Sequence, residues 1–246
     1  MISSENIKNY SSNFFIMGNN CNNNCYYCYS KQKILDDTSS KYYTEFNGFD
    51  TYINNLISHN VQYITITGHN YDPFQYKYLY DLIHYLKNSL GYPIRLETNG
   101  CLFHNNINIL GTFDIINLSI KSLNNSACRS ICGYNSLSID NIKYINAYNN
   151  VSISVVINKY NYNTIIDDIN HIWLNTNINR FYLRPDFLDN NSKIYYNFVL
   201  KYSEYLDKNI IINGLYESKT IKINYYSTGS LLIGKFLLDF KSGNYY

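Results

Sequence analysis

Short apolar runs rich in β-branched residues alternate with longer amphipathic stretches along most of this chain. Six runs have the length of buried strands and predict strands at Asn13–Met17, Tyr63–Thr67, Ile94–Glu97, Ile115–Ile120, Ser152–Ile157 and Phe181–Leu183. Helix-length segments lie between them, at Phe74–Leu90, Ser126–Ala147 and Thr164–Leu174. Repeated strand–helix alternation produces parallel sheets with right-handed crossovers. The sequence therefore predicts an α/β protein whose parallel sheet is either open or curled into a partial barrel.

The pattern changes after about residue 190 of the 246. Tyr195–Leu206 predicts a helix and Asn209–Ile212 a strand. Two further apolar runs, Thr220–Tyr226 and Leu231–Leu238, flank the turn-forming residues 227–230 and predict a β-hairpin. We therefore predict a core domain over residues 1–190 and a C-terminal extension over 191–246, which packs on the core. Residues 41–60 give the weakest structural signal.

The charge balance argues against a nucleic-acid partner. Lys and Arg number 20 against 18 Asp and Glu, which leaves a net charge of +2. A protein that binds nucleic acid through phosphate contacts carries a denser basic surface. Asn, Ile and Tyr occur 40, 33 and 29 times, and because their codons are A/T-rich, this bias suggests a viral or low-GC source. Asn and Tyr therefore carry less information here than Cys, Gly, Pro, Arg or Glu.

The N-terminal residues do not combine a charged start with an apolar run, as a signal peptide would. No window approaches the ~18 apolar residues of a membrane span. Half of the six cysteines lie between Cys21 and Cys28, which favours metal ligation in a reducing compartment over a disulfide framework. We expect a cytoplasmic protein with no membrane partner.

The three clustered cysteines are the strongest functional signal. Cys21, Cys25 and Cys28 follow a C-x3-C-x2-C spacing in the loop after the first strand, at the carboxyl end of the predicted sheet. Three thiolates in one loop can bind three irons of a [4Fe–4S] cluster. The fourth iron then has no protein ligand, and an open coordination position distinguishes a reactive metal site from a structural one. The alternative is a zinc ion with a distant fourth ligand, such as Cys101 or His69.

This triplet resembles the signature of the radical SAM superfamily. The resemblance implies a partial (β/α)6 barrel, a [4Fe–4S] cluster at Cys21, Cys25 and Cys28, and S-adenosylmethionine (SAM) chelated to the open iron. An electron from the cluster would cleave SAM to a 5′-deoxyadenosyl radical, which abstracts hydrogen from a substrate. An electron donor of the flavodoxin or ferredoxin type is then expected. Tyr27, just before the third cysteine, matches the family's aromatic residue that packs near adenine.

The end of the second predicted strand resembles the family's SAM-binding element only in part. That element is a Gly-Gly-Glu-Pro-like stretch, and here Gly68 matches a glycine while Thr67 and His69 replace the other Gly and the Glu. The resemblance implies SAM contacts at Gly68 and His69, with Asp72 in the Asp-Pro pair supplying the missing carboxylate. The alternative is an ordinary turn, because Gly, Asn, Asp and Pro are turn formers.

The third and fourth predicted strands end in polar residues. Glu97-Thr98-Asn99-Gly100 resembles a motif of several radical SAM families, including carboxy-deazaguanine synthases, and implies SAM contacts at Glu97 and Asn99. Period-2 alternation places Ser119 and Lys121 on one strand face. In the family, such residues contact the ribose and carboxylate of SAM. The alternative for both strands is a solvated polar surface.

The sixth predicted strand contributes two further candidates. By resemblance, Leu183 would cover the adenine of SAM. Arg184 follows directly and is a candidate for holding the substrate.

Three cysteines lie outside the triplet. Cys101 follows the third strand, while Cys128 and Cys132 are four residues apart on a predicted helix. We expect them to act as ligands of an auxiliary cluster, as a hydrogen donor, or simply as small buried hydrophobic residues.

These features predict a radical SAM enzyme with an unidentified substrate. The candidates are a small molecule or nucleotide, as in carboxy-deazaguanine synthases or viperin-like enzymes, or a protein, as in glycyl-radical activases. The alternative is a non-catalytic Fe–S or zinc-binding module descended from such an enzyme. The altered stretch Thr67-Gly68-His69 is the main support for that alternative.

Overall fold

A parallel sheet follows the chain in sequence order. The computed structural model describes residues 10–31, 37–59, 61–186, 188, 193–202, 210–212, 215–217 and 220–222. Seven strands pair side by side in the order β1-β2-β3-β4-β5-β6-β7, and each neighbouring pair is parallel. Their bounds are β1 Tyr10–Met17, β2 Val61–His69, β3 Ile94–Thr98, β4 Ile115–Ile120, β5 Asn150–Ile157, β6 Phe181–Pro185 and β7 Ile210–Ile212. In the part of the chain that the structure describes, β1 and β7 are the sheet edges, so the barrel is open.

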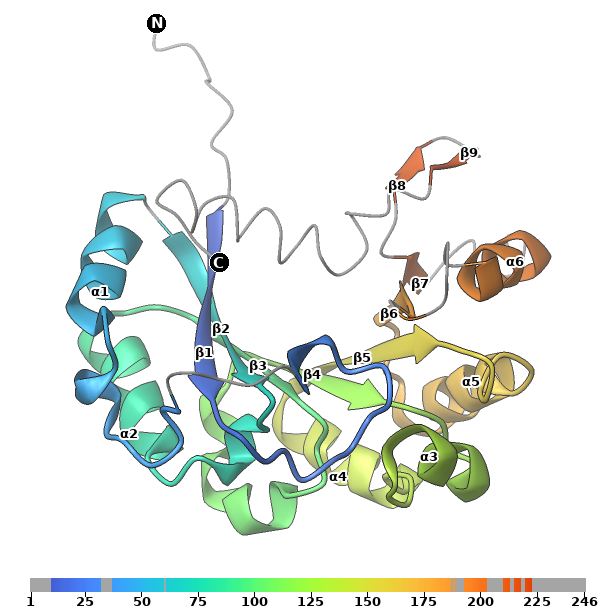
Figure 1. The fold of residues 1–246 in the computed structure, drawn as a ribbon, viewed down its shortest axis with the longest axis horizontal. Coiled ribbons are helices and arrows are strands. Elements are labelled where there is room, and N and C mark those ends of the chain that lie inside the picture. The colour runs from blue at the N-terminus through green and yellow to red at the C-terminus, as the bar shows by residue number, and fades with distance from the viewer. Residues whose placement is uncertain are drawn as a thin grey trace, which may run out of the picture.

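Helices connect the strands and lie in an arc around the sheet (Figure 1). The α-helices are α1 Phe49–Ser58, α2 Leu79–Ile83, α3 Asn125–Cys132, α4 Ile139–Tyr148, α5 Ile165–Thr176 and α6 Lys193–Tyr202. Short 3₁₀ segments cover Tyr29–Lys31, Tyr43–Glu45, Pro73–Gln75 and Phe103–Thr112, and a π-helical turn, His84–Ser89, continues α2. The six predicted strands and the predicted α/β partial barrel are confirmed.

The two faces of the sheet differ sharply in polarity. Side chains that point outward to the helices are apolar and fully buried, among them Ile64, Leu96, Ile116 and Ile153. The alternate residues point into the barrel and are mostly polar or charged, and they include Arg95, Glu97, Asn117, Ser119, Ser152, Ser154 and Arg184. Successive residues of a strand alternate between its faces, so the helices bury an apolar core while the barrel interior stays polar.

Two predicted helices need correction, and one helix was not predicted. The predicted helix Phe74–Leu90 starts with a separate 3₁₀ turn, because Asp72 caps the turn and Pro73 begins it. The predicted helix Ser126–Ala147 is two helices, since Gly133 takes a left-handed conformation with φ 81° and ends α3. The weak segment 41–60 contains α1, which the sequence did not predict.

The predicted C-terminal extension contributes a strand to the core sheet. Helix α6 comes first, and the strand β7 that follows it pairs with β6 of the core. Strands β8 Leu215–Glu217 and β9 Thr220–Lys222 form an antiparallel pair that the sequence did not predict. The predicted partner strand Leu231–Leu238 and its turn lie outside the described residues.

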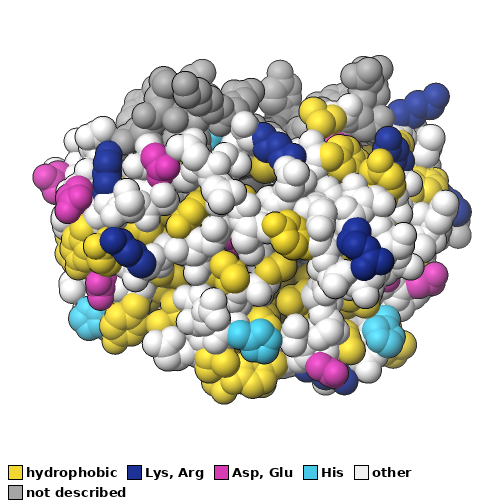
Figure 2. Space-filling view, turned by 60° about the horizontal axis from the view of Figure 1, so that its bottom comes forward, with side chains coloured by type: hydrophobic (Ala, Val, Ile, Leu, Met, Phe, Trp, Pro, Cys, Tyr) yellow, Lys and Arg dark blue, Asp and Glu magenta, His cyan; other side chains and the backbone are white. Residues whose placement is uncertain are grey.

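The exterior of the described chain carries dispersed charge. On the face shown in Figure 2, Lys and Arg side chains are scattered among uncharged residues and form no continuous basic stripe. Among the described residues, no helix is both long enough and apolar enough to cross a membrane.

Candidate metal and cofactor site

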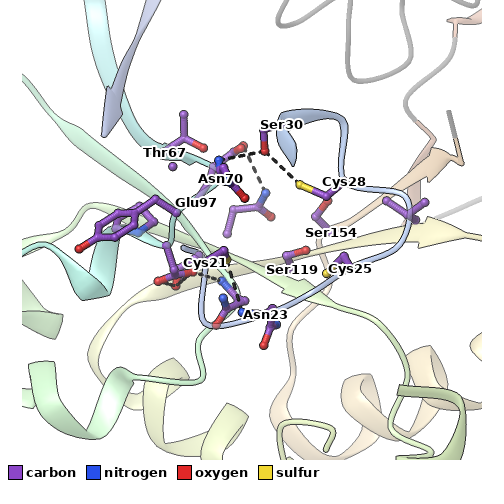
Figure 3. A pocket seen from close by; sticks show the side chains of 18 of the residues that line it. Cys21, Asn23, Cys25, Cys28, Ser30, Thr67, Asn70, Glu97, Ser119 and Ser154 are labelled. Carbon is purple, nitrogen blue, oxygen red and sulfur yellow. Dashed lines mark hydrogen bonds between the residues drawn. The ribbon is translucent and has the colours of Figure 1, made fainter. Parts of the chain in front are cut away.

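The carboxyl ends of the strands surround a cavity of about 210 Å³ (Figure 3). Its walls come from β1 to β6 and from the loop that follows β1. Most of the site residues predicted from the sequence line this cavity, namely Cys21, Cys25, Tyr27, Cys28, Gly68, Asp72, Glu97, Asn99, Ser119, Lys121 and Arg184. The fold therefore brings residues from six separate strand ends and loops to one place.

The cysteine loop is held from two sides. On one side, the Gln75 amide oxygen accepts hydrogen bonds from the backbone N–H of Asn22 (3.0 Å) and of Asp72 (3.1 Å). Its amide nitrogen donates to the carbonyl of Asn20 at 3.1 Å. On the other side, the N–H groups of residues 24 and 26 donate to the last carbonyls of α3 at 2.9 and 3.0 Å. These contacts fix the loop that carries all three thiols without using the thiols themselves.

The three thiols of the triplet are half-buried and lie at the cavity wall. Ser30 lies 3.0 Å from the Cys28 sulfur and accepts a hydrogen bond from the Asn70 N–H at 3.0 Å, so its own hydrogen is available to that sulfur (Figure 3). Burial raises the pKa of Cys21 to about 11. A hydrogen bond with Cys132, together with burial, raises the pKa of Cys25 further still. The thiols of Cys21 and Cys25 therefore stay protonated at neutral pH unless a bound metal cation displaces the proton.

The donor set fits a [4Fe–4S] cluster. Three cysteine sulfurs from one loop face one cavity, and the buried ammonium of Lys121 acts to lower the pKa of Cys25. Within the described residues, no three His, Cys, Asp or Glu side chains converge as ligands of one metal ion. A [4Fe–4S] cluster presents a separate iron to each thiolate, so its ligands need not converge on one point.

Gly68 allows the chain after β2 to fold back sharply toward the cavity. A Cβ atom at this position would lie only 1.8 Å from the backbone oxygen of Tyr71. Asn70, two residues later, takes a left-handed conformation with φ 49°. Any side chain at residue 68 would therefore push this turn away from the cavity wall.

Asp72 is buried, and its carboxylate is already engaged. It accepts hydrogen bonds from the N–H of Phe74 (3.0 Å), the N–H of Asn99 (2.8 Å) and the hydroxyl of Thr98 (2.9 and 3.0 Å to the two oxygens). Burial raises the pKa of Asp72, and these hydrogen bonds act against that rise. The carboxylate thus joins the end of β2 to the end of β3, which leaves it little capacity for the SAM contact that the resemblance implies.

Glu97 lies inside the barrel between two guanidinium groups. Its carboxylate is 3.5 Å from Arg95 and 3.6 Å from Arg184, and the Asn117 amide donates to it at 3.4 Å. Burial acts to raise the pKa of Glu97, but Arg184 and Arg95 together outweigh this effect, so the pKa lies below its ordinary value. The carboxylate is therefore ionised at neutral pH and faces the cavity.

This lowered pKa predicts a specific pH dependence. A carboxyl group with a depressed folded-state pKa contributes stability that is present above its unfolded value, about 4.3, and lost as the pH falls through the folded value. The difference in free energy of unfolding between wild type and Glu97→Gln is expected to shrink below about pH 4. Urea unfolding of both proteins at several pH values from 7 to 3 measures this difference. The exposed Glu45→Gln is the matched control, and a difference for Glu97→Gln that does not vary with pH would contradict the prediction.

Lys121 reaches back along its own strand. Its ammonium donates to the carbonyl oxygen (2.7 Å) and the hydroxyl (2.8 Å) of Ser119. Both residues line the cavity, as the period-2 alternation of β4 predicts. A buried positive charge is thereby held beside the cysteine loop.

Two predicted SAM contacts do not line the cavity. Leu183 is fully buried in the apolar core on the helix side of the sheet, because alternation along β6 turns Arg184 inward instead. His69 is the last residue of β2, and its carbonyl accepts a hydrogen bond from the Gly18 N–H at 3.1 Å. Its side chain is absent from the cavity wall, and burial lowers its pKa.

The three remaining cysteines also lie outside the cavity wall. The Cys101 thiol points to the amide oxygen of Asn23 (3.8 Å) and the carbonyl of Asn99 (3.9 Å). Cys128 and Cys132 contact each other on α3, with sulfurs 3.7 Å apart. Among the described residues, no hydrogen bond joins the Cys101 thiol to the Cys128–Cys132 pair, and the auxiliary cluster stays a prediction.

Sequence reasoning missed several residues of the site. Gln75 closes a capping box with Asp72, and the Asp-Pro-Phe-Gln spacing is a signal that could have revealed it. Ser154 lies on the inward face of β5 and lines the cavity, as period-2 alternation could have predicted. Ser30 has no local signal, because its contact with Asn70 joins segments forty residues apart.

The family model of the radical SAM superfamily matches residues 15–172. This chain belongs to the radical SAM superfamily. The resemblance predicted from the cysteine triplet is thereby confirmed, and the family implies SAM and a [4Fe–4S] cluster as cofactors. No curated protein matches the chain.

Solved radical SAM structures share this fold. Streptococcus suis SuiB matches with a TM-score of 0.64 and 15% identity, over 85% of this chain and 50% of SuiB. SuiB has also been solved bound to the precursor peptide SuiA. anSMEcpe with bound AdoMet matches with a TM-score of 0.54 and 12% identity, over 96% of this chain and 62% of that protein. TYW1 with a lysine-pyruvate adduct bound matches with a TM-score of 0.53 and 16% identity, over 79% of this chain and 71% of TYW1. This radical SAM chain spans about half the length of SuiB.

Proposed function

We propose that this chain is a radical SAM enzyme whose [4Fe–4S] cluster is held by Cys21, Cys25 and Cys28. One observation carries the proposal: the three cysteines share a single cavity with the polar ends of β3 and β4. When bound, such a cluster supplies the electron that cleaves SAM reductively to a 5′-deoxyadenosyl radical, which abstracts hydrogen from the substrate. The electron would come from a donor of the flavodoxin or ferredoxin type.

The chain's own residues would bind and orient the cofactor. The ammonium of Lys121 and the hydroxyl of Ser119, which both line the cavity, would contact the carboxylate and ribose of SAM. The amide of Asn99 lines the same wall, where the Asn22 side chain holds it at 2.7 Å. Tyr27 packs behind the cysteine loop, and its buried hydroxyl has no hydrogen-bond partner among the described residues. That hydroxyl is available to a polar group of the bound cofactor.

Arg184 is the candidate for holding the substrate. Arg95 and Arg184 face the single carboxylate of Glu97, and the Nε of each arginine is buried without a hydrogen-bond partner in the described part of the chain. A buried unpaired N–H group costs free energy, and a planar guanidinium pairs well with carboxylate or phosphate. We infer a substrate that presents an anionic group to Arg184. The peptide bound to SuiB keeps a peptide among the candidates, beside small molecules and nucleotides.

Anaerobic reconstitution followed by reduction tests the proposal. We expect an EPR signal of a reduced [4Fe–4S] cluster that changes when SAM is added, together with formation of 5′-deoxyadenosine. Anionic and neutral candidate substrates can then be compared for their ability to stimulate 5′-deoxyadenosine formation. A cluster whose spectrum ignores SAM, or a chain that takes up zinc and no iron, would favour the alternative of a non-catalytic metal-binding module.

A further inference from the structure

Helix α3 carries two cysteines that the proposed function does not use. Cys128 and Cys132 are four residues apart and so lie on the same helix face. They are buried, with exposed fractions of 4% and 1%, in a small cluster with Tyr27 and Ile131. Cys25 of the proposed metal-binding triplet packs against this cluster.

The backbone fixes Cys25 over this face of α3. The last carbonyls of a helix have no partner within the helix. Here the carbonyls of Cys132 and Ile131 accept hydrogen bonds from the N–H groups of Asn24 (2.9 Å) and Tyr26 (3.0 Å), the two residues that flank Cys25. The position of Cys25 relative to α3 is therefore set independently of any contact between sulfur atoms.

The three thiols lie close together. Cys25 packs against the cluster that contains Cys132, and the sulfurs of Cys128 and Cys132 are 3.7 Å apart. An interaction with the Cys132 thiol is also the largest cause of the raised pKa of Cys25. The Cys132 thiol also lies 3.2 Å from the Cys128 carbonyl, which is a second acceptor for its hydrogen. While Cys25 is a thiol, either sulfur of the Cys25–Cys132 pair can donate.

Iron binding to Cys25 would decide which of the two sulfurs donates. An iron-bound Cys25 is a thiolate with no hydrogen, so only Cys132 can donate in the pair. A charged acceptor makes a stronger hydrogen bond than a neutral carbonyl, so the Cys132 hydrogen is expected to turn to Cys25. Cys128 can then donate to the Cys132 sulfur, which aligns both thiols in one direction and strengthens the chain.

We propose that Cys132 is a positioning residue for the cluster, whose thiol donates an S–H···S hydrogen bond to the iron-bound sulfur of Cys25 and thereby raises the midpoint potential of the cluster. The inference rests on the proposed function, because it requires Cys25 to bind iron. Hydrogen bonds to cluster sulfurs are among the determinants of reduction potential. The reduced cluster carries one more negative charge than the oxidised one, so a donor aimed at a ligand sulfur stabilises the reduced form more.

An EPR-monitored redox titration of the reconstituted protein tests this inference without any substrate. The midpoint potential of Cys132→Ala is expected to be more negative than that of wild type. Cys132→Ser keeps a hydroxyl donor and is expected to restore a potential close to wild type. Cys128→Ala is expected to shift the potential in the same direction as Cys132→Ala, but by less. Cys101→Ala is the matched control and is expected to leave the potential unchanged, since the Cys101 thiol points to Asn23 and Asn99.

Iron content and far-UV circular dichroism accompany each titration, so that cluster loading and folding are known. An unchanged potential in fully loaded Cys132→Ala would overturn the inference and leave the proposed function intact. Loss of iron from both Cys132→Ala and Cys132→Ser would instead make Cys132 an iron ligand, which also overturns it. A wild-type chain that takes up no cluster would overturn the inference and the proposed function together.

Discussion

Replacement of Cys28 by alanine is expected to abolish cluster binding, so that anaerobically reconstituted protein holds almost no iron instead of about four per chain. Cys28 is one of the three proposed thiolate ligands, so the variant would bind the cluster through two protein ligands only. The Ser30 hydroxyl would remain beside the vacant position, but it binds iron far less well than a thiolate. Iron and sulfide analysis, the brown colour of the protein and 5′-deoxyadenosine formation measure the effect.

Cys101→Ala is the matched control for this experiment. Cys101 is half-buried, as Cys28 is, and its thiol reaches Asn23 within the cysteine loop, yet it lies outside the triplet. Its variant should retain about four irons per chain. If Cys101→Ala lost its metal as completely as Cys28→Ala, Cys101 would be a fourth ligand. One zinc per chain in the wild type would then favour the zinc alternative.

The second large effect is expected at Asp72. Asp72→Ala would leave three groups without their acceptor, the N–H of Phe74, the N–H of Asn99 and the hydroxyl of Thr98. Each unsatisfied buried donor lowers the free energy of unfolding, while removal of the buried charge offsets part of that loss. We expect the free energy of unfolding to fall by about 3 kcal/mol. Because Asp72 joins the ends of β2 and β3, SAM should also perturb the EPR signal of this variant less.

Two variants make this prediction specific. Asp72→Asn keeps one acceptor oxygen, so its stability is expected to lie between those of wild type and Asp72→Ala. Asp140→Ala removes a carboxylate whose side chain is 86% exposed, and its stability should stay close to wild type. Equal stability of Asp72→Ala and Asp140→Ala in urea unfolding would show that the Asp72 carboxylate does not hold the two strand ends together.

The strands could be predicted from the sequence because their signal is local. The run Ile115–Ile120 consists of Ile and Leu except at the alternate positions Asn117 and Ser119, and the structure gives β4 the same bounds. Helix ends were harder to predict, since they depend on caps and on single residues with special backbone conformations. Gly133 divides one predicted helix into two, and the Asp72 cap separates a 3₁₀ turn from α2.

The candidate site could be predicted where the backbone pattern decides which way a side chain points. Period-2 alternation placed Ser119 and Lys121 on one face of β4, and both line the cavity. The same rule applied to β6 would have assigned Arg184 to the interior and Leu183 to the core, but the family resemblance suggested Leu183. Asp72 was identified from the sequence as a site residue, yet its hydrogen-bond partners on β3 were not.

The sequence by itself determined the fold class and the superfamily of this protein. Both depend on short-range patterns, namely the alternation of strands and helices and the spacing of Cys21, Cys25 and Cys28. Only the tertiary structure decided which distant residues meet: Cys132 with Cys25, Asp72 with Asn99, and Arg184 with Glu97. Such contacts depend on how helices and strand ends pack in the folded chain, and no local pattern encodes contacts between residues 27, 87 and 107 positions apart.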